Sequence, residues 1–96
     1  MEDNLEEDEM QSMEHGPMAP LITAVHENQP ILVALRSSRK LIGSVKATDR
    51  HWNLIMENAT ELWTGKDKRI HRRNIGRLFV RGDNVISIVP NPKISE

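Results

Sequence analysis

Two polar turns of this chain carry side chains that could bind a nucleobase. His51 and Asn53 lie in the first turn, and Arg81 lies in the second. The flat imidazole of His51 can stack on an unpaired base, and the Arg81 guanidinium offers a plane for the opposite face with an added cation–π attraction. Asn53 carries both a donor and an acceptor, which suit the acceptor and donor on the edge of uracil. On residue type alone, an ordinary exposed turn histidine is the favoured interpretation of His51.

The same turns offer little for catalysis. Asp49 and His51 could form an acid–base pair, but no candidate nucleophile or phosphate-binding loop accompanies them. The Asp49 carboxylate is better suited to accept backbone N–H groups in its own turn and to hold Asn53 in place. The chain has no cysteine, and its other histidines lack metal-ligand spacing. We therefore expect no enzyme, no metal site and no cofactor, and a reducing compartment.

A short helix is expected ahead of these turns. Pro20 fits the first helical turn, where its missing N–H costs nothing. Three apolar residues then share one face at helical spacing, namely Leu21, Ile22 and Val25. Asn28 ends the pattern, which predicts a helix near 20–27. Because about two turns of helix are too short to be stable alone, this helix must pack on another element.

Five strands are expected after the helix. Apolar or alternating runs predict strands near 31–35, 41–49, 53–63, 77–80 and 84–89, with a polar turn at 37–40 and a basic connection at 64–74. The last two strands are predicted to form a hairpin about 81–84, with Gly82 supplying a positive φ. This order predicts a mainly β fold, in which a short N-terminal helix caps a strongly bent, open, five-stranded antiparallel barrel.

The side-chain pattern of the strands adds three expectations. In the second strand, Leu41, Gly43, Val45 and Ala47 should share one face, and Gly43 permits a bulge or a sharp bend there. Trp52 is expected to pack, and Trp63 to lie in the core or at a subunit contact. The final strand, 85–89, is apolar and carries no charge that would discourage pairing. Strand addition between subunits is therefore favoured, and it closes a ring if the rotation per step is suitable.

Charge divides the chain into two parts. Residues 1–15 hold seven acids and no Lys or Arg, so the remainder holds all thirteen Lys and Arg against seven acids. We expect a disordered acidic arm at 1–16, one domain at 17–92 and a short tail at 93–96. A basic domain favours a polyanionic partner. Five cations of the 64–74 connection could follow RNA phosphates or stay solvated: Lys66, Lys68, Arg69, Arg72 and Arg73. No apolar run is long enough to span a membrane, so no membrane partner is expected.

Two passages together resemble the Sm and Sm-like family. The first contains Leu41-Ile-Gly43, Val45, Ala47, Asp49-Arg-His-Trp-Asn53 and Leu54-Ile-Met-Glu-Asn58, and the second contains Leu78-Phe-Val-Arg-Gly-Asp83 and Val85-Ile86. They are similar to the two Sm motifs in the family's order, and the similarity covers residues 17–92. The D-type branch of the family is the most similar. Two features depart from it: the 64–74 connection is compact, and Trp52 replaces a smaller residue.

The resemblance implies the Sm fold, an SH3-like barrel, and an RNA-binding subunit of spliceosomal small nuclear ribonucleoproteins that act in pre-mRNA splicing. Such subunits form a hetero-heptameric ring around a uridine-rich single-stranded site in small nuclear RNA. The implied RNA-binding residues are His51, Asn53, Arg81, Gly82, Arg50 and Asp83, with loop support from Asp49 and Gly43. The implied ring neighbours are the first D-type and the F-type Sm proteins, with the E, G, B and third D types completing the ring. The implied location is the nucleus, with a cytoplasmic assembly phase.

Two alternatives stay open at this point. One is a subunit of an Sm-like ring in messenger RNA decay, or a homo-oligomeric RNA chaperone. The other is an adaptor that pairs its edge strands with protein partners and binds no RNA. Salt dependence separates RNA binding from strand pairing, because only phosphate contacts lose affinity steeply with ionic strength.

Overall fold

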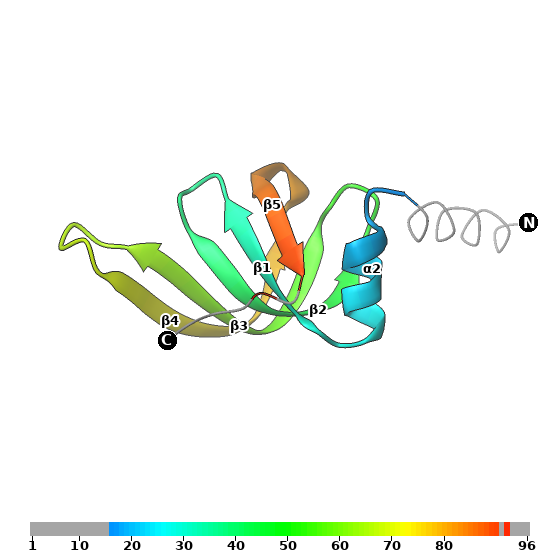
Figure 1. Cartoon of the computed structure of the whole chain (residues 1–96), viewed down its shortest axis with the longest axis horizontal. Helices are drawn as coiled ribbons and strands as arrows, with labels where there is room; N and C mark the ends of the chain where they lie inside the picture. Colours follow the sequence, from blue (N-terminus) through cyan, green and yellow to red (C-terminus); the bar gives the residue numbers. More distant parts are fainter. Residues whose placement is uncertain (1–15, 91, 93–96) are drawn as a thin grey trace, which may run out of the picture.

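One short helix and five strands follow each other along the chain. The computed structural model describes residues 16–90 and 92, so residues 1–15 of the predicted acidic arm and the predicted tail at 93–96 lie outside the described residues. The elements are α2 (Ala19–His26), β1 (Pro30–Leu35), β2 (Lys40–Thr48), β3 (Leu54–Thr64), β4 (Ile70–Val80), a 3₁₀ turn (Gly82–Asn84) and β5 (Val85–Pro90). The mainly β fold with a short N-terminal helix is confirmed (Figure 1).

The strands form one antiparallel sheet in the order β4-β3-β2-β1-β5. The sheet bends strongly, with β5 crossing in front of its middle and α2 standing at one end (Figure 1). Because β5 pairs with β1 and not with β4, the predicted hairpin between the last two strands is wrong. Residues 81–84 instead carry the chain from one edge of the sheet to the other. The barrel is therefore open, and β4 and β5 are its two edge strands.

The bend of β2 and β3 comes from two irregularities in their pairing. The register shifts between Ile42 and Ser44, opposite a segment of β3 in which Asn58 has φ 53°. A Cβ on Gly43 would lie 2.8 Å from the Glu57 carbonyl oxygen, so only glycine lets β3 approach this closely. The bend predicted at Gly43 is therefore present, with the extra residue on β3.

A second shift lies between Val45 and Ala47, where one residue is inserted into β2. Beyond this inserted residue, side chains that would have pointed to the core point to solvent instead, since a change of register by one residue exchanges the two faces of the strand. Ala47 is consequently exposed, while Leu41, Gly43 and Val45 are buried. The prediction that all four residues share one face is wrong for Ala47.

The core is aliphatic and lies between the bent sheet and the helix. Its largest fully buried side chains are Ile31, Val33, Leu41, Val45, Leu54 and Met56. The helix buries Leu21 and Ala24 and contacts β2 and β5. Trp52 packs against this core, as expected. No helix in the described part of the chain is long and apolar enough to cross a membrane.

The predicted connection at 64–74 is wrong in its extent. β3 and β4 continue pairing to Thr64 and Ile70, which leaves only a tight turn between them. The first half of β4 escaped prediction because both of its faces are polar beyond the barrel, so it lacks the alternation of a half-buried strand. Trp63 lies on this extension, half-buried and outside the core, where the Arg39 guanidinium and the His71 ring contact it.

Candidate nucleic-acid interface

The loop at 49–53, between β2 and β3, is organised by the carboxylate of Asp49. Its Oδ1 atom accepts the backbone N–H of His51 at 2.8 Å and that of Asn53 at 3.1 Å. Its Oδ2 atom accepts a hydrogen bond from Asn53 Nδ2 at 2.9 Å. The contact expected between Asp49 and Asn53 is therefore present. With three donors on one carboxylate, the loop has a defined shape before any ligand arrives.

These hydrogen bonds also set the charge of the loop. The Asn53 side chain, followed by the backbone N–H groups of His51 and Asn53, holds the pKa of the Asp49 carboxyl below its ordinary value. Donors that stabilise the ionised form lower the pKa in this way. Asp49 is therefore ionised at neutral pH and already occupied, which makes it a poor proton acceptor for catalysis.

Asn53 also joins this loop to the turn at 81–84. Its Oδ1 atom accepts the backbone N–H of Gly82 at 2.7 Å, across 29 positions of sequence. Since Oδ1 faces an N–H and Nδ2 faces a carboxylate, the orientation of the amide is determined by its partners. An amide has two N–H groups and two acceptor positions, so Asn53 keeps one of each for a ligand.

Gly82 lies where the two loops touch. A Cβ at this position would lie 1.9 Å from the carbonyl oxygen of His51 and 2.9 Å from the carbonyl carbon of Trp52. Only glycine therefore allows this close approach of two backbones. The positive φ predicted for Gly82 is absent, because Gly76 is the only glycine with a positive φ among the described residues.

Arg81 and Asp83 flank Gly82 and point into solvent. Their side chains are 76% and 71% exposed, and Arg81 Nη2 lies 3.3 Å from Asp83 Oδ2. An ion pair this exposed contributes little stability. The Arg81 guanidinium can therefore leave Asp83 for a ligand at small cost.

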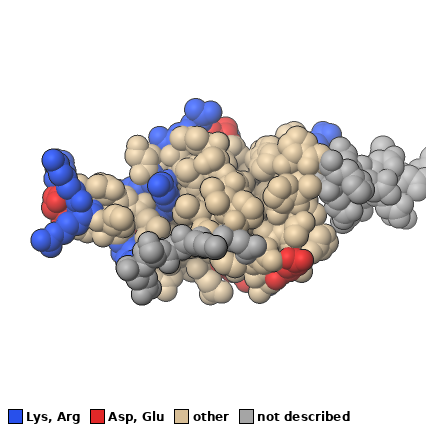
Figure 2. Space-filling model, viewed as in Figure 1, with Lys and Arg blue, Asp and Glu red and all other residues tan. Residues whose placement is uncertain are grey.

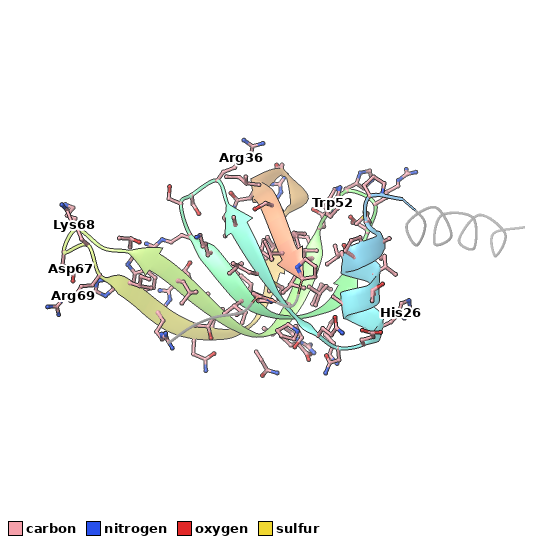
Figure 3. The ribbon with its side chains drawn as sticks, in the orientation of Figure 1. His26, Arg36, Trp52, Asp67, Lys68 and Arg69 are labelled. Carbon is pink, nitrogen blue, oxygen red and sulfur yellow. The ribbon has the colours of Figure 1, made fainter. Side chains whose placement is uncertain are left out.

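Arg36 is a residue of this site that the sequence reasoning missed. It follows β1, and its Nε atom donates to the Asp83 carbonyl oxygen at 2.8 Å. Its backbone N–H donates to the Asn84 carbonyl oxygen at 2.9 Å. A third turn thus holds the 81–84 turn from the other side, and Figure 3 shows Arg36 at the same edge of the molecule as the tip of β5. No spacing rule links a lone turn arginine to a loop 47 positions away.

The other predicted residues are placed as follows. His51 and Arg50 are exposed in the 49–53 loop, while Trp52 turns away from solvent with φ 65°. Gly43 lies inside β2, where it serves the approach of β3 and not the loops themselves. Seven of the eight predicted residues, Asp49 included, therefore lie in two touching loops. Among the described residues, no group of three His, Asp or Glu side chains could hold a metal ion.

Comparison with known proteins agrees with this geometry. The model of the LSM domain matches residues 22–90, and the chain belongs to this family. Small nuclear ribonucleoprotein Sm D2 of Saccharomyces cerevisiae is 43% identical over 91 residues, which cover 92% of this chain and 83% of that protein. The probable Sm D2 protein of Caenorhabditis elegans is 41% identical over 87 residues, covering 80% of this chain and 74% of that protein.

Solved structures of the family share the fold. A heptameric archaeal Sm protein matches with a TM-score of 0.61 and 35% identity, over 77% of this chain and 98% of that chain. The heptamer of SmAP1 from P. aerophilum matches with a TM-score of 0.61 and 35% identity, over 78% of this chain and 92% of that chain. The predicted Sm family and Sm fold are thus confirmed.

Proposed function

We propose that this chain is a core Sm subunit of spliceosomal small nuclear ribonucleoproteins, and that it binds the uridine-rich Sm site of small nuclear RNA within a heptameric ring. The observation that carries the proposal is the hydrogen bond from Gly82 N–H to Asn53 Oδ1, at 2.7 Å. It unites the two loops that hold His51 and Arg81. Sm D2 relatives and heptameric Sm structures support the same role.

The two loops provide complementary parts of a base-binding site. His51 stacks on one face of a uracil and Arg81 covers the other face, while Asn53 uses its remaining donor and acceptor on the base edge. Gly82 lets the backbone of the turn approach the base closely, and Arg50 and Asp83 lie at the edge of the base-binding site. Each stacked base contributes about 1–3 kcal/mol. A ring with several such sites binds one strand far more tightly than a single subunit.

The edges of the sheet suit assembly into that ring. Among the described residues, β4 and β5 have no strand partner on their outer sides, and both expose large apolar side chains. Phe79 on β4 is 61% exposed, and Ile86 and Val89 on β5 are 62% and 46% exposed. Pairing of β4 from one subunit with β5 of the next would bury these groups. The neighbours we propose are the first D-type and the F-type Sm proteins, with the E, G, B and third D types completing the ring.

We propose that the protein acts by binding and not by catalysis. The acid–base candidate beside His51 was Asp49, whose carboxylate is ionised and hydrogen-bonded to three donors within the loop. A role in small nuclear ribonucleoproteins places the working protein in the nucleus. We further propose a cytoplasmic phase in which the ring assembles.

A tagged chain isolated from native cells tests this function. Sequencing the bound RNA and identifying the bound proteins should give capped small nuclear RNAs and six other Sm proteins. Messenger RNA fragments with decapping factors would instead support an Sm-like ring in decay. Protein partners without RNA would overturn the RNA-binding proposal.

A further inference from the structure

The N-terminal segment 1–15 and the domain that follows it carry opposite charge. The segment, which lies outside the described residues, holds seven acids and no Lys or Arg, whereas the rest of the chain holds thirteen Lys and Arg against seven acids. Four of the seven acids are consecutive, at 6–9. Because the two charges belong to one chain, they attract each other before any partner is present. Which cations the segment binds depends on which are available and within its reach.

Four cations on or beside the sheet already have carboxylate partners. Glu57 and Glu61 on β3 each lie between a cation on the β2 side and a cation on β4. The cations are Lys46 and Arg77 at Glu57, and Arg39 and Arg73 at Glu61. A further carboxylate would gain little from these four side chains, because their charge is already balanced in part.

The arginines beside the two loops are balanced less well. Arg36 and Arg81 are both exposed. The Arg36 Nε atom donates to the Asp83 carbonyl oxygen, which carries no net charge. The carboxylate of Asp83 lies 3.3 Å from Arg81, but both side chains are more than two-thirds exposed, so this ion pair contributes little. The guanidinium groups of Arg36 and Arg81 can therefore bind a further carboxylate.

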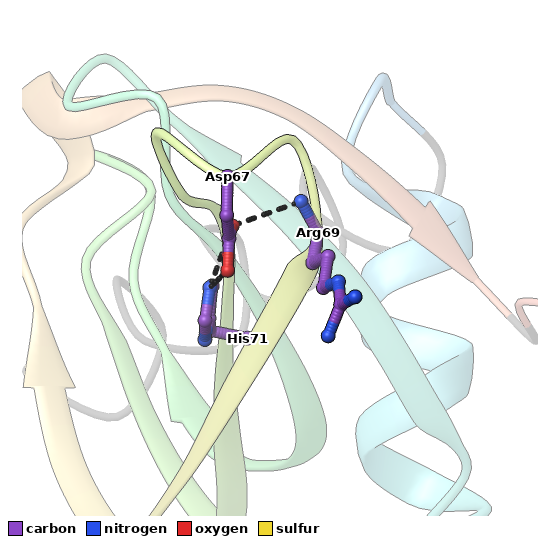
Figure 4. Close-up of polar contacts among 3 residues, drawn as sticks. All are labelled: Asp67, Arg69 and His71. Carbon is purple, nitrogen blue, oxygen red and sulfur yellow. Dashed lines mark hydrogen bonds and ion pairs between the residues drawn. The ribbon is translucent and has the colours of Figure 1, made fainter.

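A second group of exposed cations lies at the far end of the molecule, in and beside the turn between β3 and β4 (Figure 2). The group consists of Lys66, Lys68, Arg69 and Arg72. The carboxylate of this turn, Asp67, accepts the backbone N–H of Arg69 at 3.0 Å and lies 3.0 Å from His71 Nε2 (Figure 4). By charge alone, this turn would attract an acidic segment more strongly than the two loops.

Reach favours the loops instead. Figure 1 shows the chain entering α2 at the end of the molecule opposite the β3–β4 turn, and the domain is 55 Å long. A fully extended chain spans about 3.3–3.6 Å per residue, so the acids at 6–9 lie within about 35 Å of Gly16. Figure 3 shows Trp52 of the 49–53 loop near α2, and the hydrogen bond from Gly82 to Asn53 holds the 81–84 turn beside that loop. The acids at 6–9 can therefore reach the loops and cannot reach the β3–β4 turn.

We infer that the acidic segment 1–15 docks on Arg36 and Arg81 beside the two loops and competes there with RNA. The inference rests on the proposed function, because it assigns a regulator to the same site. Carboxylate and phosphate seek the same guanidinium groups. Uridine-rich RNA also gains base stacking, which carboxylates cannot provide, and so displaces the segment. RNA that binds through phosphates alone is kept out at concentrations where uridine-rich RNA still binds.

A first measurement detects the docked segment without RNA. The chain has no cysteine, so Gln11→Cys gives one site for a nitroxide label and leaves the acids unchanged. In the full chain at 50 mM salt, the label should broaden the amide NMR signals of 49–53 and 81–84, and 500 mM salt should remove this effect. The control is the same labelled chain with the acids at 6–9 changed to amides. Equal broadening in the control, or the strongest broadening at 65–72, would overturn the inference.

A second measurement tests the competition. Each variant is mixed with the six other Sm proteins and a labelled uridine-rich RNA, and the apparent affinity is measured by fluorescence anisotropy. The amide variant should bind about three- to tenfold more tightly than wild type, because the docked carboxylates no longer have to be displaced. In a chain that also carries Arg36→Gln and Arg81→Gln, the amide change should give less than about a twofold gain.

The matched control for this cycle removes two charges from the far turn, by Lys66→Gln with Lys68→Asn. Asparagine suits position 68, where φ is 63°. The amide change should keep its full gain in this background. A gain that is equal in all backgrounds would overturn the inference, because it would come from the overall field of the segment. A gain that is lost only with the Lys66 and Lys68 changes would place the segment at the far turn and overturn it too.

Failure of this inference is distinguishable from failure of the proposed function. If the wild-type assembly does not bind the uridine-rich RNA, the proposed function is wrong, and the NMR measurement still decides whether the segment docks. If the RNA binds and the label broadens no loop signals, only the docked segment is excluded. Loop broadening without any gain in RNA affinity would overturn the competition.

Discussion

The side-chain oxygen of Asn53 accepts the backbone N–H of Gly82 at 2.7 Å, which joins two loops that lie 29 positions apart in the sequence. The Nδ2 atom of the same amide donates to Asp49 at 2.9 Å. A chain of hydrogen bonds therefore runs from the carboxylate that shapes the first loop to the backbone of the second. The loops that carry His51 and Arg81 have a common, predetermined geometry, so the RNA binding proposed for these residues would lose less entropy in ordering the loops.

Substitution of Asn53 is expected to affect stability as well as RNA binding. Asn53→Ala removes the acceptor for the partly buried Gly82 N–H, which should lower the free energy of unfolding by about 1–3 kcal/mol. Asn74→Ala is the matched control, because Asn74 is exposed on β4 and its change should stay within about 0.5 kcal/mol. Chemical denaturation followed by circular dichroism measures both. Equal stabilities would show that the Gly82 N–H finds another partner.

Gly82→Ala should disrupt the contact between the loops. Its methyl group would lie 1.9 Å from the His51 carbonyl oxygen, so one of the two loops that the Asn53 hydrogen bond joins has to shift. We expect a loss of about 1–3 kcal/mol or more, as in overpacked sites. Gly76→Ala separates sterics from conformation, because Gly76 has φ 85° but nothing within 4 Å of its added Cβ. Gly76→Ala should reduce stability and leave RNA binding unchanged, whereas Gly82→Ala should reduce both.

Asp49 should give the loop a pH dependence in the acid range. Its pKa is lowered in the folded state, so its contribution is present above the unfolded pKa of about 4 and is lost as pH falls through the folded pKa. The difference in stability between wild type and Asp49→Asn should therefore be constant at neutral pH and shrink below about pH 4. Glu57 and Asp67, whose pKa values are also lowered, titrate in both proteins and cancel in this difference. A difference independent of pH down to pH 2 would contradict the role of the ionised carboxylate.

The sequence predicted the elements of the fold better than their partners. The helix was expected at 20–27 and is found at Ala19–His26, because proline and a helical apolar spacing are local signals. The hairpin of the last two strands was wrong, since a four-residue polar turn between apolar runs is typical of both a hairpin and a crossing to the far edge. What decides is the pairing of Val33 with Ile88, a long-range contact that periodicity does not encode.

For the site, too, local signals were predictive and long-range contacts were not. Residue chemistry and the family motifs identified His51, Asn53 and Arg81 as candidates, and the structure places all three in two touching loops. Arg36 was missed because its contact with Asp83 depends on three-dimensional proximity alone. Ala47 was assigned to the wrong face because the alternating pattern of β2 does not reveal the residue inserted between Val45 and Ala47.

Arg81→Ala tests the stacking role with little structural disturbance. Arg81 is 76% exposed and its ion pair with Asp83 contributes little to stability. Loss of one stacking face should weaken binding of a uridine-rich RNA by about 1–3 kcal/mol, or roughly five- to 150-fold, while ring assembly is kept. Lys40→Gln removes one exposed charge outside the loops and serves as the control. If Arg81→Ala prevents assembly, the 81–84 turn has a structural role and the assignment to RNA is wrong.

A charge placed on the β5 edge should prevent ring formation without unfolding the subunit. Ile86 is 62% exposed on β5, so Ile86→Lys costs the isolated fold little. In a ring, this side chain would be buried against the neighbouring subunit, where an unpaired ammonium is strongly unfavourable. Ile55→Lys is the control, because Ile55 is 39% exposed but lies on β3, which has strand partners on both sides. Each variant is mixed with the six other Sm proteins and a uridine-rich RNA, and size-exclusion chromatography with light scattering should show heptamers for Ile55→Lys and smaller species for Ile86→Lys. Heptamers from both variants would exclude β5 as the assembly edge.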